Sequence, residues 1–216
     1  MPVSRAPTSG RRAVKDPRTV RVTRARIPRG PEHGTYALIL RAASRRRIRI
    51  GKLGTLAVRP GSYVYVGSAY GPGGLRGRLR HHMRPAARPH WHIDYLRRCT
   101  RLDGVWLALD APSREHAWAG VFERFPERMI PLLGFGSSGC SCRTHLFFFR
   151  MPPDLKRFRR CVRARVPGHA RVEGIPIAAE AGWVLPACET SRRRDAPYSS
   201  RFQVRPRWRI RKTRSS

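Results

Sequence analysis

At 216 residues, the chain is long enough to bury one ordinary hydrophobic core and to leave some length outside it. No run approaches the roughly 18 apolar residues of a membrane-spanning helix, which argues against a membrane protein. Five cysteines without an apolar secretory segment argue against a disulfide framework, so we expect a reducing, cytoplasmic compartment.

The formal net charge of +33 arises from 46 Lys and Arg against 13 Asp and Glu. Such a charge favours a polyanionic partner, because each cation placed on a phosphate releases condensed counterions. Nucleic acid is therefore the expected partner. A second interpretation is compositional: 42 Arg against 4 Lys, with abundant Gly and Pro, is also typical of a GC-rich genome. The scarcity of acids favours binding, since biased composition does not by itself remove Asp and Glu.

The hydrophobic pattern divides the chain into three parts. Residues 1–33 mix Arg, Pro, Ser and Thr without a period and are predicted to be a disordered basic arm. Residues 34–152 are predicted to fold as one domain, and residues 153–216 to form a basic, largely disordered tail. Two short apolar patches in that tail, Gly174–Ile177 and Gly182–Leu185, can dock on the domain without forming a second one.

The first half of the domain is predicted to contain strands and then helices. Short apolar runs separated by Gly, Pro and Ser predict four strands: Tyr36–Leu40, Ile48–Ile50, Thr55–Val58 and Tyr63–Val66. The pattern then turns helical from Gly74 to about Met83, and Trp91–Cys99 is a second short helix candidate. A strand pattern returns at Gly104–Leu109.

The second half of the domain is predicted to add one helix and one strand. Ser113 is a plausible N-cap for a helix with four apolar residues on one face and Glu115 in its first turn: Trp118, Val121, Phe122 and Phe125. The last predicted strand, His145–Phe149, is too apolar for an exposed edge. Together these elements predict an α+β domain, a mostly antiparallel sheet with helices packed on it, flanked by disordered basic tails.

Four residues in this pattern suit phosphodiester chemistry. Hydrolysis needs a group that orients or deprotonates water, and a cation that stabilises the developing negative charge. Arg78 suits the second role, because its guanidinium stays protonated and can donate two bonds to one phosphate. His82 lies four residues after it on the same helix face. Tyr36 and Tyr65 can bind water or phosphate, or act as bases if their pKa is lowered; from spacing alone they are equally typical of ordinary sheet residues.

The residues from Gly34 to about Phe149 resemble the GIY-YIG endonuclease superfamily. The match consists of Gly34-Thr-Tyr36, then Tyr65-Val-Gly67, then an arginine on the following helix. More narrowly, His90-Trp-His-Ile-Asp-Tyr-Leu96 and Gly134-Phe-Gly-Ser-Ser138 resemble a small branch of unknown function, sometimes joined to a base-excision DNA glycosylase. The spacing from Tyr36 to Tyr65 is longer than in typical members, and an extra hairpin between Ile48 and Val58 would fill it.

The resemblance implies a metal-dependent DNA endonuclease that acts in DNA repair or processing, with a glycosylase as a potential partner. Tyr36, Tyr65, Arg78 and His82 would be the catalytic residues. Glu115 would hold Mg²⁺ or Mn²⁺, because the superfamily places a metal-binding glutamate on a later helix. Around them we expect five residues to contact nucleic acid: Gly67, Arg76, Arg80, His90 and His92. The alternative is a binding module that keeps the fold without turnover and assists a DNA-repair partner.

A second set of residues has the composition of a zinc site. Cys140, Cys142 and His145 offer three ligands, and His90 or His92 would supply the fourth. Cys-x-Cys is tighter than the usual Cys-x-x-Cys spacing. The other interpretation is therefore a buried, inert cysteine pair, with histidines that bond to backbone or to DNA.

Overall fold

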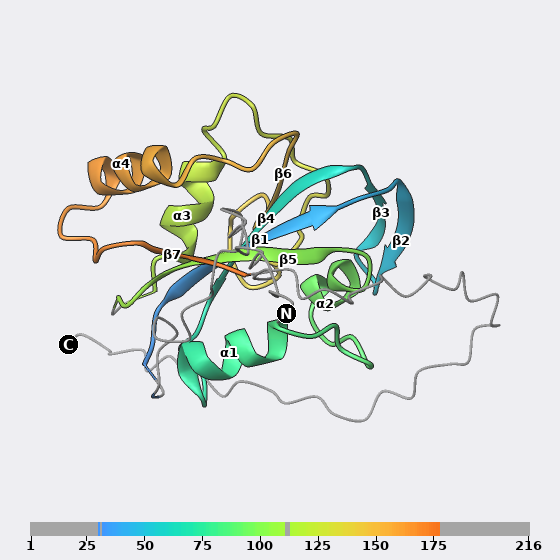
Figure 1. Ribbon diagram of the computed structural model, residues 1–216, viewed down its shortest axis with the longest axis horizontal. Coiled ribbons are helices and arrows are strands. Elements are labelled where there is room, and N and C mark those ends of the chain that lie inside the picture. Colours follow the sequence, from blue (N-terminus) through green and yellow to red (C-terminus); the bar gives the residue numbers. More distant parts are fainter. Residues whose placement is uncertain (1–29, 31, 111–112, 178–216) are drawn as a thin grey trace, which may run out of the picture.

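Figure 1 shows the computed structural model of the chain. The structure describes residues 30, 32–110 and 113–177. Within these ranges the chain forms strands and helices in this order: β1 (Thr35–Ala42), β2 (Arg46–Ile50), β3 (Gly54–Val58), β4 (Gly61–Ser68), α1 (Gly74–His82), α2 (His92–Arg97), β5 (Arg101–Ala108), α3 (Glu115–Phe122), β6 (Leu146–Phe149), α4 (Leu155–Arg165) and β7 (Glu173–Pro176). The predicted α+β class is confirmed.

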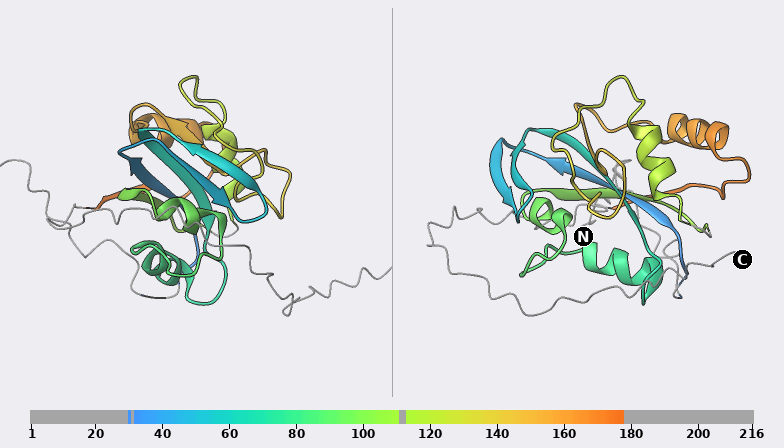
Figure 2. Two further views of the ribbon diagram at one scale, coloured as in Figure 1. Left: turned by 90° about the vertical axis from the view of Figure 1, so that its right-hand side faces the viewer. Right: turned by 180° about the vertical axis from the view of Figure 1, so that it is seen from behind.

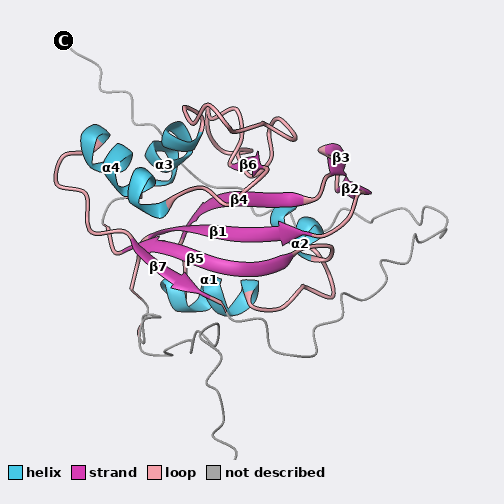
Figure 3. Ribbon diagram, turned by 45° about the horizontal axis from the view of Figure 1, so that its top comes forward, coloured by secondary structure: helices cyan, strands magenta, loops and turns pink. Residues whose placement is uncertain are grey.

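Five of these strands form one antiparallel sheet in the order β6-β4-β1-β5-β7 (Figure 3). β2 and β3 pair with each other as a separate hairpin. The first residue of β1, Thr35, lies opposite Ser68 at the end of β4 and Ala108 at the end of β5. The chain segments that lead into α1 and α3 therefore leave the sheet at the same end, where β1 begins.

Helices cover both faces of the sheet (Figure 2). α1, α2 and the β2–β3 hairpin pack on one face, and α3 and α4 pack on the other. Alternate residues of β1 point to opposite sides, so Leu38 and Leu40 join the first core while Ala37 and Ile39 join the second. The second core is rich in aromatic residues, with the rings of Phe122 and Phe158 stacked at 4.5 Å between centroids.

The folded part extends past residue 152, where the hydrophobic pattern placed the end of the domain. α4 begins after Asp154, whose carboxylate accepts a hydrogen bond from Arg157 N at 2.6 Å as an N-cap. Its apolar residues Phe158 and Val162 are buried against α3, although arginines occupy most other positions. The patch Gly174–Ile177 docks on the domain through β7, and Gly182–Leu185 lies outside the described residues.

β6 is the last strand at its side of the sheet, yet all four of its residues are buried. Met129 covers it through an isolated bridge, with Met129 N and Phe148 N each donating to the other residue's carbonyl at 2.8 Å. The apolar strand is thus protected from solvent, in agreement with the expectation that it could not be an exposed edge.

Among the residues that the structure describes, no helix combines the length and apolar character needed to cross a membrane.

Candidate functional site

Tyr36 lies at the start of β1, directly opposite Gly67 of β4. A side chain at Gly67 would place its Cβ 2.7 Å from the Tyr36 ring and hydroxyl, so only glycine leaves room for this tyrosine. The Tyr36 hydroxyl is hydrogen-bonded to His82 Nε2 at 2.9 Å, and the residue is only 3% exposed. The register of the sheet and the position of α1 thus join two residues that lie 46 positions apart.

The tyrosines of β1 and β4 are protonated at neutral pH. Burial raises the pKa of Tyr36 well above its usual value; the neighbouring Tyr65 phenol raises this pKa further, and the charge of Arg78 partly offsets the increase. Burial likewise raises the pKa of Tyr65, as does the charge of Glu115, again with an opposing contribution from Arg78. Both phenols therefore act as hydrogen-bonding groups rather than bases. The charges of Arg78 and Glu115 thus act on the pKa of both tyrosines.

Arg78 lies on α1, with its guanidinium 4.3 Å from the centre of the Trp91 ring. Among the described residues it makes no ion pair with a carboxylate. Stacking on the aromatic face holds the planar group in place while leaving its N–H donors unused by an acid. Such a guanidinium can bind an added anion.

A buried polar cluster connects α1 to α2, and we call His81, His82 and Asp94 the α1–α2 cluster. Asp94 is 1% exposed and accepts hydrogen bonds from His90 N at 2.9 Å, Trp91 N at 3.0 Å and His81 Nε2 at 2.8 Å. Burial opposes ionisation of Asp94, but these hydrogen bonds together hold its pKa below the usual value. Both carboxylate oxygens are thus occupied by protein donors.

His82 is neutral in this cluster. Burial, helped by the neighbouring charge of His81, lowers its pKa to about 3. Its backbone carbonyl accepts two bonds from the Arg97 guanidinium, at 3.2 Å from Nε and 3.0 Å from Nη2. Arg97 therefore fixes the end of α1, and α1 in turn fixes the imidazole beside Tyr36.

Glu115 is the first residue of α3 and lies close to the start of β1. Arg114 N donates to Thr35 Oγ1 at 2.9 Å, and Glu115 N donates to Ser113 Oγ at 3.4 Å. The Glu115 side chain is 22% exposed, and Oε1 lies 3.6 Å from His116 Nε2. Its charge raises the pKa of both Tyr36 and Tyr65. Unlike Asp94, which is buried and accepts three hydrogen bonds, the Glu115 side chain is partly exposed.

A second polar cluster begins at His116, the residue after Glu115. We call it the cysteine–histidine cluster, and it consists of His116, Cys140, Cys142 and His145. Their ligand atoms all lie within 4.8 Å of one another. Sequence spacing identified three of these residues but not His116, which belongs to α3. His92 instead accepts a hydrogen bond at Nδ1 from Gly136 N, at 3.1 Å, and His90 is exposed.

The remaining predicted contact residues differ in their surroundings. Arg76 and Arg80 are exposed on α1, where they can meet a polyanion. Gly67 is buried beneath the Tyr36 ring, so its structural role is to make space for that ring.

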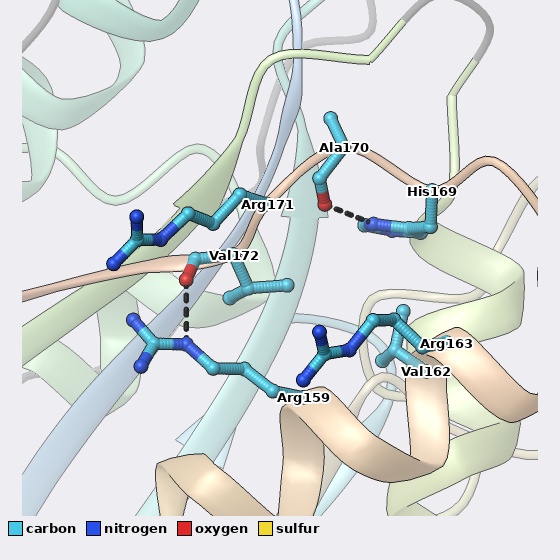
Figure 4. Close-up of a pocket in the computed structure, with 7 residues that line it drawn as sticks. All are labelled: Arg159, Val162, Arg163, His169, Ala170, Arg171 and Val172. Atoms are coloured by element: carbon cyan, nitrogen blue, oxygen red, sulfur yellow. Dashed lines mark hydrogen bonds between the residues drawn. The ribbon is translucent and has the colours of Figure 1, made fainter.

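A basic pocket of about 410 Å³ lies apart from these tyrosines, between α4 and the segment leading to β7 (Figure 4). Three arginines line it, Arg159 and Arg163 from α4 and Arg171 from the connecting segment. Arg159 is held by a hydrogen bond from Nε to the Val172 carbonyl at 2.7 Å. Ala170 N donates to Asp110 Oδ1 at 3.0 Å, which ties this segment to the chain between β5 and α3.

Apart from the basic pocket, the residues of this site all lie within a span that matches one described protein family. Residues 35–166 match the family described as "Domain of unknown function DUF123", a span that is more than half of the chain and runs from β1 through α4. No curated protein and no solved structure matches the chain.

Proposed function

The chain belongs to the DUF123 family, a domain of unknown function, and we propose that its site is that of a metal-dependent DNA endonuclease. The observation that carries this proposal is geometric: Tyr36 lies at the start of β1, opposite Gly67 of β4, and its hydroxyl is hydrogen-bonded to His82, which follows Arg78 by four residues on α1. Arg114 N, next to Glu115, donates to Thr35 Oγ1, next to Tyr36, so the first turn of α3 reaches the end of the sheet where β1 begins. The resemblance of the same residues to the GIY-YIG superfamily supports the proposal.

The residues present fit a divalent cation. Magnesium is usually held by one or two carboxylates together with water and substrate phosphates. Glu115 offers one accessible carboxylate, whereas both oxygens of Asp94 are occupied. Mg²⁺ or Mn²⁺ held at Glu115 would neutralise charge on the phosphate during hydrolysis. This assignment makes Glu115 the metal-binding residue.

The protein residues have separate roles in the proposed reaction. Water attacks phosphorus and releases one proton to solvent, one P–O bond of the DNA backbone breaks, and the leaving oxygen takes up one proton from solvent. Arg78 donates hydrogen bonds to the non-bridging oxygens, where negative charge accumulates. Tyr65, as a neutral phenol, donates a hydrogen bond to water or phosphate. His82 acts as a positioning residue that fixes the Tyr36 hydroxyl.

The basic surface would supply binding energy for the rest of the substrate. Arg80 is exposed on α1, two residues after Arg78. The pocket lined by Arg159, Arg163 and Arg171 offers a second place for backbone phosphates. Contacts of this kind hold nucleic acid without reading its sequence, and their strength falls steeply with salt.

One observation favours a second candidate, a nucleic-acid-binding module without turnover that assists a DNA-repair partner such as a glycosylase. The Tyr36 hydroxyl is buried and already bonded to His82, which is unusual for a group that must meet a substrate. In this candidate Arg78 would bind phosphate but would not serve a reaction.

Cleavage assays with matched variants separate the two candidates. Full-length protein with Mg²⁺ or Mn²⁺ is offered nicked, branched, flapped and single-stranded DNA, with the corresponding RNAs in parallel. We expect cleavage of at least one DNA, lowered about 10²–10³-fold by Arg78→Ala. Arg80→Ala, on the same helix, is the control and should weaken binding with a salt slope smaller by about 1 while leaving cleavage at saturation intact.

The outcomes bear differently on the two candidates. Metal-dependent cleavage that is abolished by Glu115→Gln removes the binding-module candidate. Salt-dependent binding without cleavage of any substrate removes the nuclease and supports the module. If the protein neither binds nor cuts nucleic acid, both candidates are wrong.

A further inference from the structure

We propose that the cysteine–histidine cluster is a zinc site with four protein ligands, His116, Cys140, Cys142 and His145. The ligands converge from two parts of the chain: His116 from α3, and the other three from the segment between Gly134 and β6. Two thiolates and two imidazoles are a common ligand set for structural zinc, and two thiolates would neutralise the charge of the ion. This inference is independent of the nuclease proposal.

The distances between ligand atoms match a tetrahedral ion. Zn–S bonds near 2.3 Å and Zn–N bonds near 2.05 Å put sulfur and nitrogen ligands about 3.5 Å apart. His116 Nδ1 lies 3.3 Å from Cys142 Sγ, and His145 Nε2 lies 3.5 Å from Cys140 Sγ. Two thiol–imidazole hydrogen bonds would explain these two separations. They would not require all four atoms to lie within 4.8 Å of one another, as they do.

The site is held in place by the backbone around it. His145 N donates to Phe135 O at 2.8 Å, and Val66 N donates to His145 O at 2.9 Å, so His145 is fixed beside β4. Gly134 N donates to Arg143 O at 2.8 Å, which closes the segment that carries both cysteines. The ligands from this segment are therefore largely preorganised, which lowers the entropic cost of binding a metal.

Four protein ligands leave no open position, so we assign the zinc a structural role. It would join the first turn of α3 to the segment from Gly134 to His145. That segment contacts Tyr65 through Gly136, and His116 directly follows Glu115. Loss of the ion would release the segment from the first turn of α3 and leave the exposed ion pair of Arg143 with Glu123, at the end of α3, as a weaker link.

Metal analysis of the full chain tests the assignment. Protein produced in zinc-supplemented medium and purified without chelators is expected to hold about one zinc per chain by elemental analysis. Cys142→Ser and His116→Ala should each lower retained zinc several-fold after dialysis. Cys161→Ala, on α4, and His90→Ala, which is exposed, are the matched controls and should retain zinc like the wild type.

Two further measurements keep the test informative if a variant folds poorly. Co²⁺ added to metal-free wild type should give the absorption of a tetrahedral ion with thiolate charge transfer. Chelation should increase tryptic cleavage after Arg143, and added zinc should reverse it. Folded wild type without bound zinc and without the cobalt spectrum would contradict the proposal. So would unchanged zinc in Cys142→Ser, whereas zinc lost from His90→Ala but kept in His116→Ala would reject His116 as the fourth ligand.

Discussion

The α1–α2 cluster and the cysteine–histidine cluster both gather metal-ligating side chains near Tyr36 and Tyr65, but their atoms are occupied in different ways. Asp94 accepts three hydrogen bonds from its own neighbourhood, and His82 Nε2 is joined to Tyr36. A cation there would have to displace protein donors from a buried carboxylate. The sulfur and nitrogen atoms of the other cluster instead face one another.

The same residue types can therefore form either a hydrogen-bonded structural network or a metal site. Where protein donors already use the acceptor atoms, the cluster is a structural network that holds α1 against α2. Where soft thiolates and imidazoles converge at tetrahedral distances, the same residue types are suited to zinc. The segment Gly134–Ser138 contacts both α2 and the cysteine–histidine cluster: Gly136 N donates to His92 Nδ1, and a Cβ added at Gly136 would lie 2.8 Å from Tyr65 Cε2 and 3.1 Å from His145 Cβ.

Of the changes considered, acid should destabilise the folded protein most, because it protonates His82 in the α1–α2 cluster. The pKa of His82 is about 3 in the folded protein against the usual 6.5, so between these pH values the unfolded chain binds a proton that the folded chain does not. The stability due to neutral His82 is fully present above pH 6.5 and is lost as pH falls toward 3, in total about 5 kcal/mol. We expect the free energy of unfolding, measured with denaturant at a series of pH values, to fall less steeply with acid in His82→Gln than in the wild type.

A variant of the proposed zinc site tests whether this pH effect is independent of zinc. Because the effect belongs to His82, the difference in slope should persist when both proteins also carry Cys142→Ser. His90→Gln, an exposed neighbour, serves as the control and should keep the wild-type slope. Equal slopes for His82→Gln and wild type would show that His82 does not resist protonation in the folded state.

Asp94→Asn should weaken the same cluster without a change of pH. The amide keeps the size of the side chain and one acceptor oxygen, but its NH₂ group cannot accept the hydrogen bonds now donated to the other oxygen, either by His81 or by the two backbone N–H groups. We expect a loss of about 3 kcal/mol in the free energy of unfolding, and unchanged zinc content. Asp103→Asn is the matched control, because Asp103 pairs with the half-exposed Arg41 and Arg101 and should cost at most about 1 kcal/mol. Equal costs for the two variants would contradict the assigned network.

The local sequence pattern predicted the helices and strands better than it predicted the contacts between them. Strand runs and helical spacing placed β1 to β6 and α1 to α3, because period and turn residues are local properties. α4 was missed because arginines surround its apolar positions, although Leu155, Phe158 and Val162 already fall at helical spacing. The zinc alternative found Cys140 and Cys142 through their short spacing.

The contacts that sequence reasoning missed depend on tertiary structure. The bond from Tyr36 to His82 requires Gly67 to lie opposite Tyr36, and strand register sets that relation. His116 lies 24 residues from Cys140 and has no motif of its own. The available signal was its place beside Glu115 in the first turn of a predicted helix.

Gly136→Ala tests the segment shared by both clusters and should have the smallest of these effects. Gly136 has φ of 75°, and an added Cβ would lie 2.8 Å from Tyr65 Cε2 and 3.1 Å from His145 Cβ. Left-handed backbone and this close contact together should cost about 2 kcal/mol in the free energy of unfolding. Because Tyr65 and His145 must both move, zinc affinity should fall as well, which calorimetric titration can measure. Gly139→Ala, in the same segment and with no atom within 4 Å of its added Cβ, should change stability by less than about 0.5 kcal/mol. If the two variants were equally stable, the contacts of Gly136 with Tyr65 and His145 would not constrain this segment.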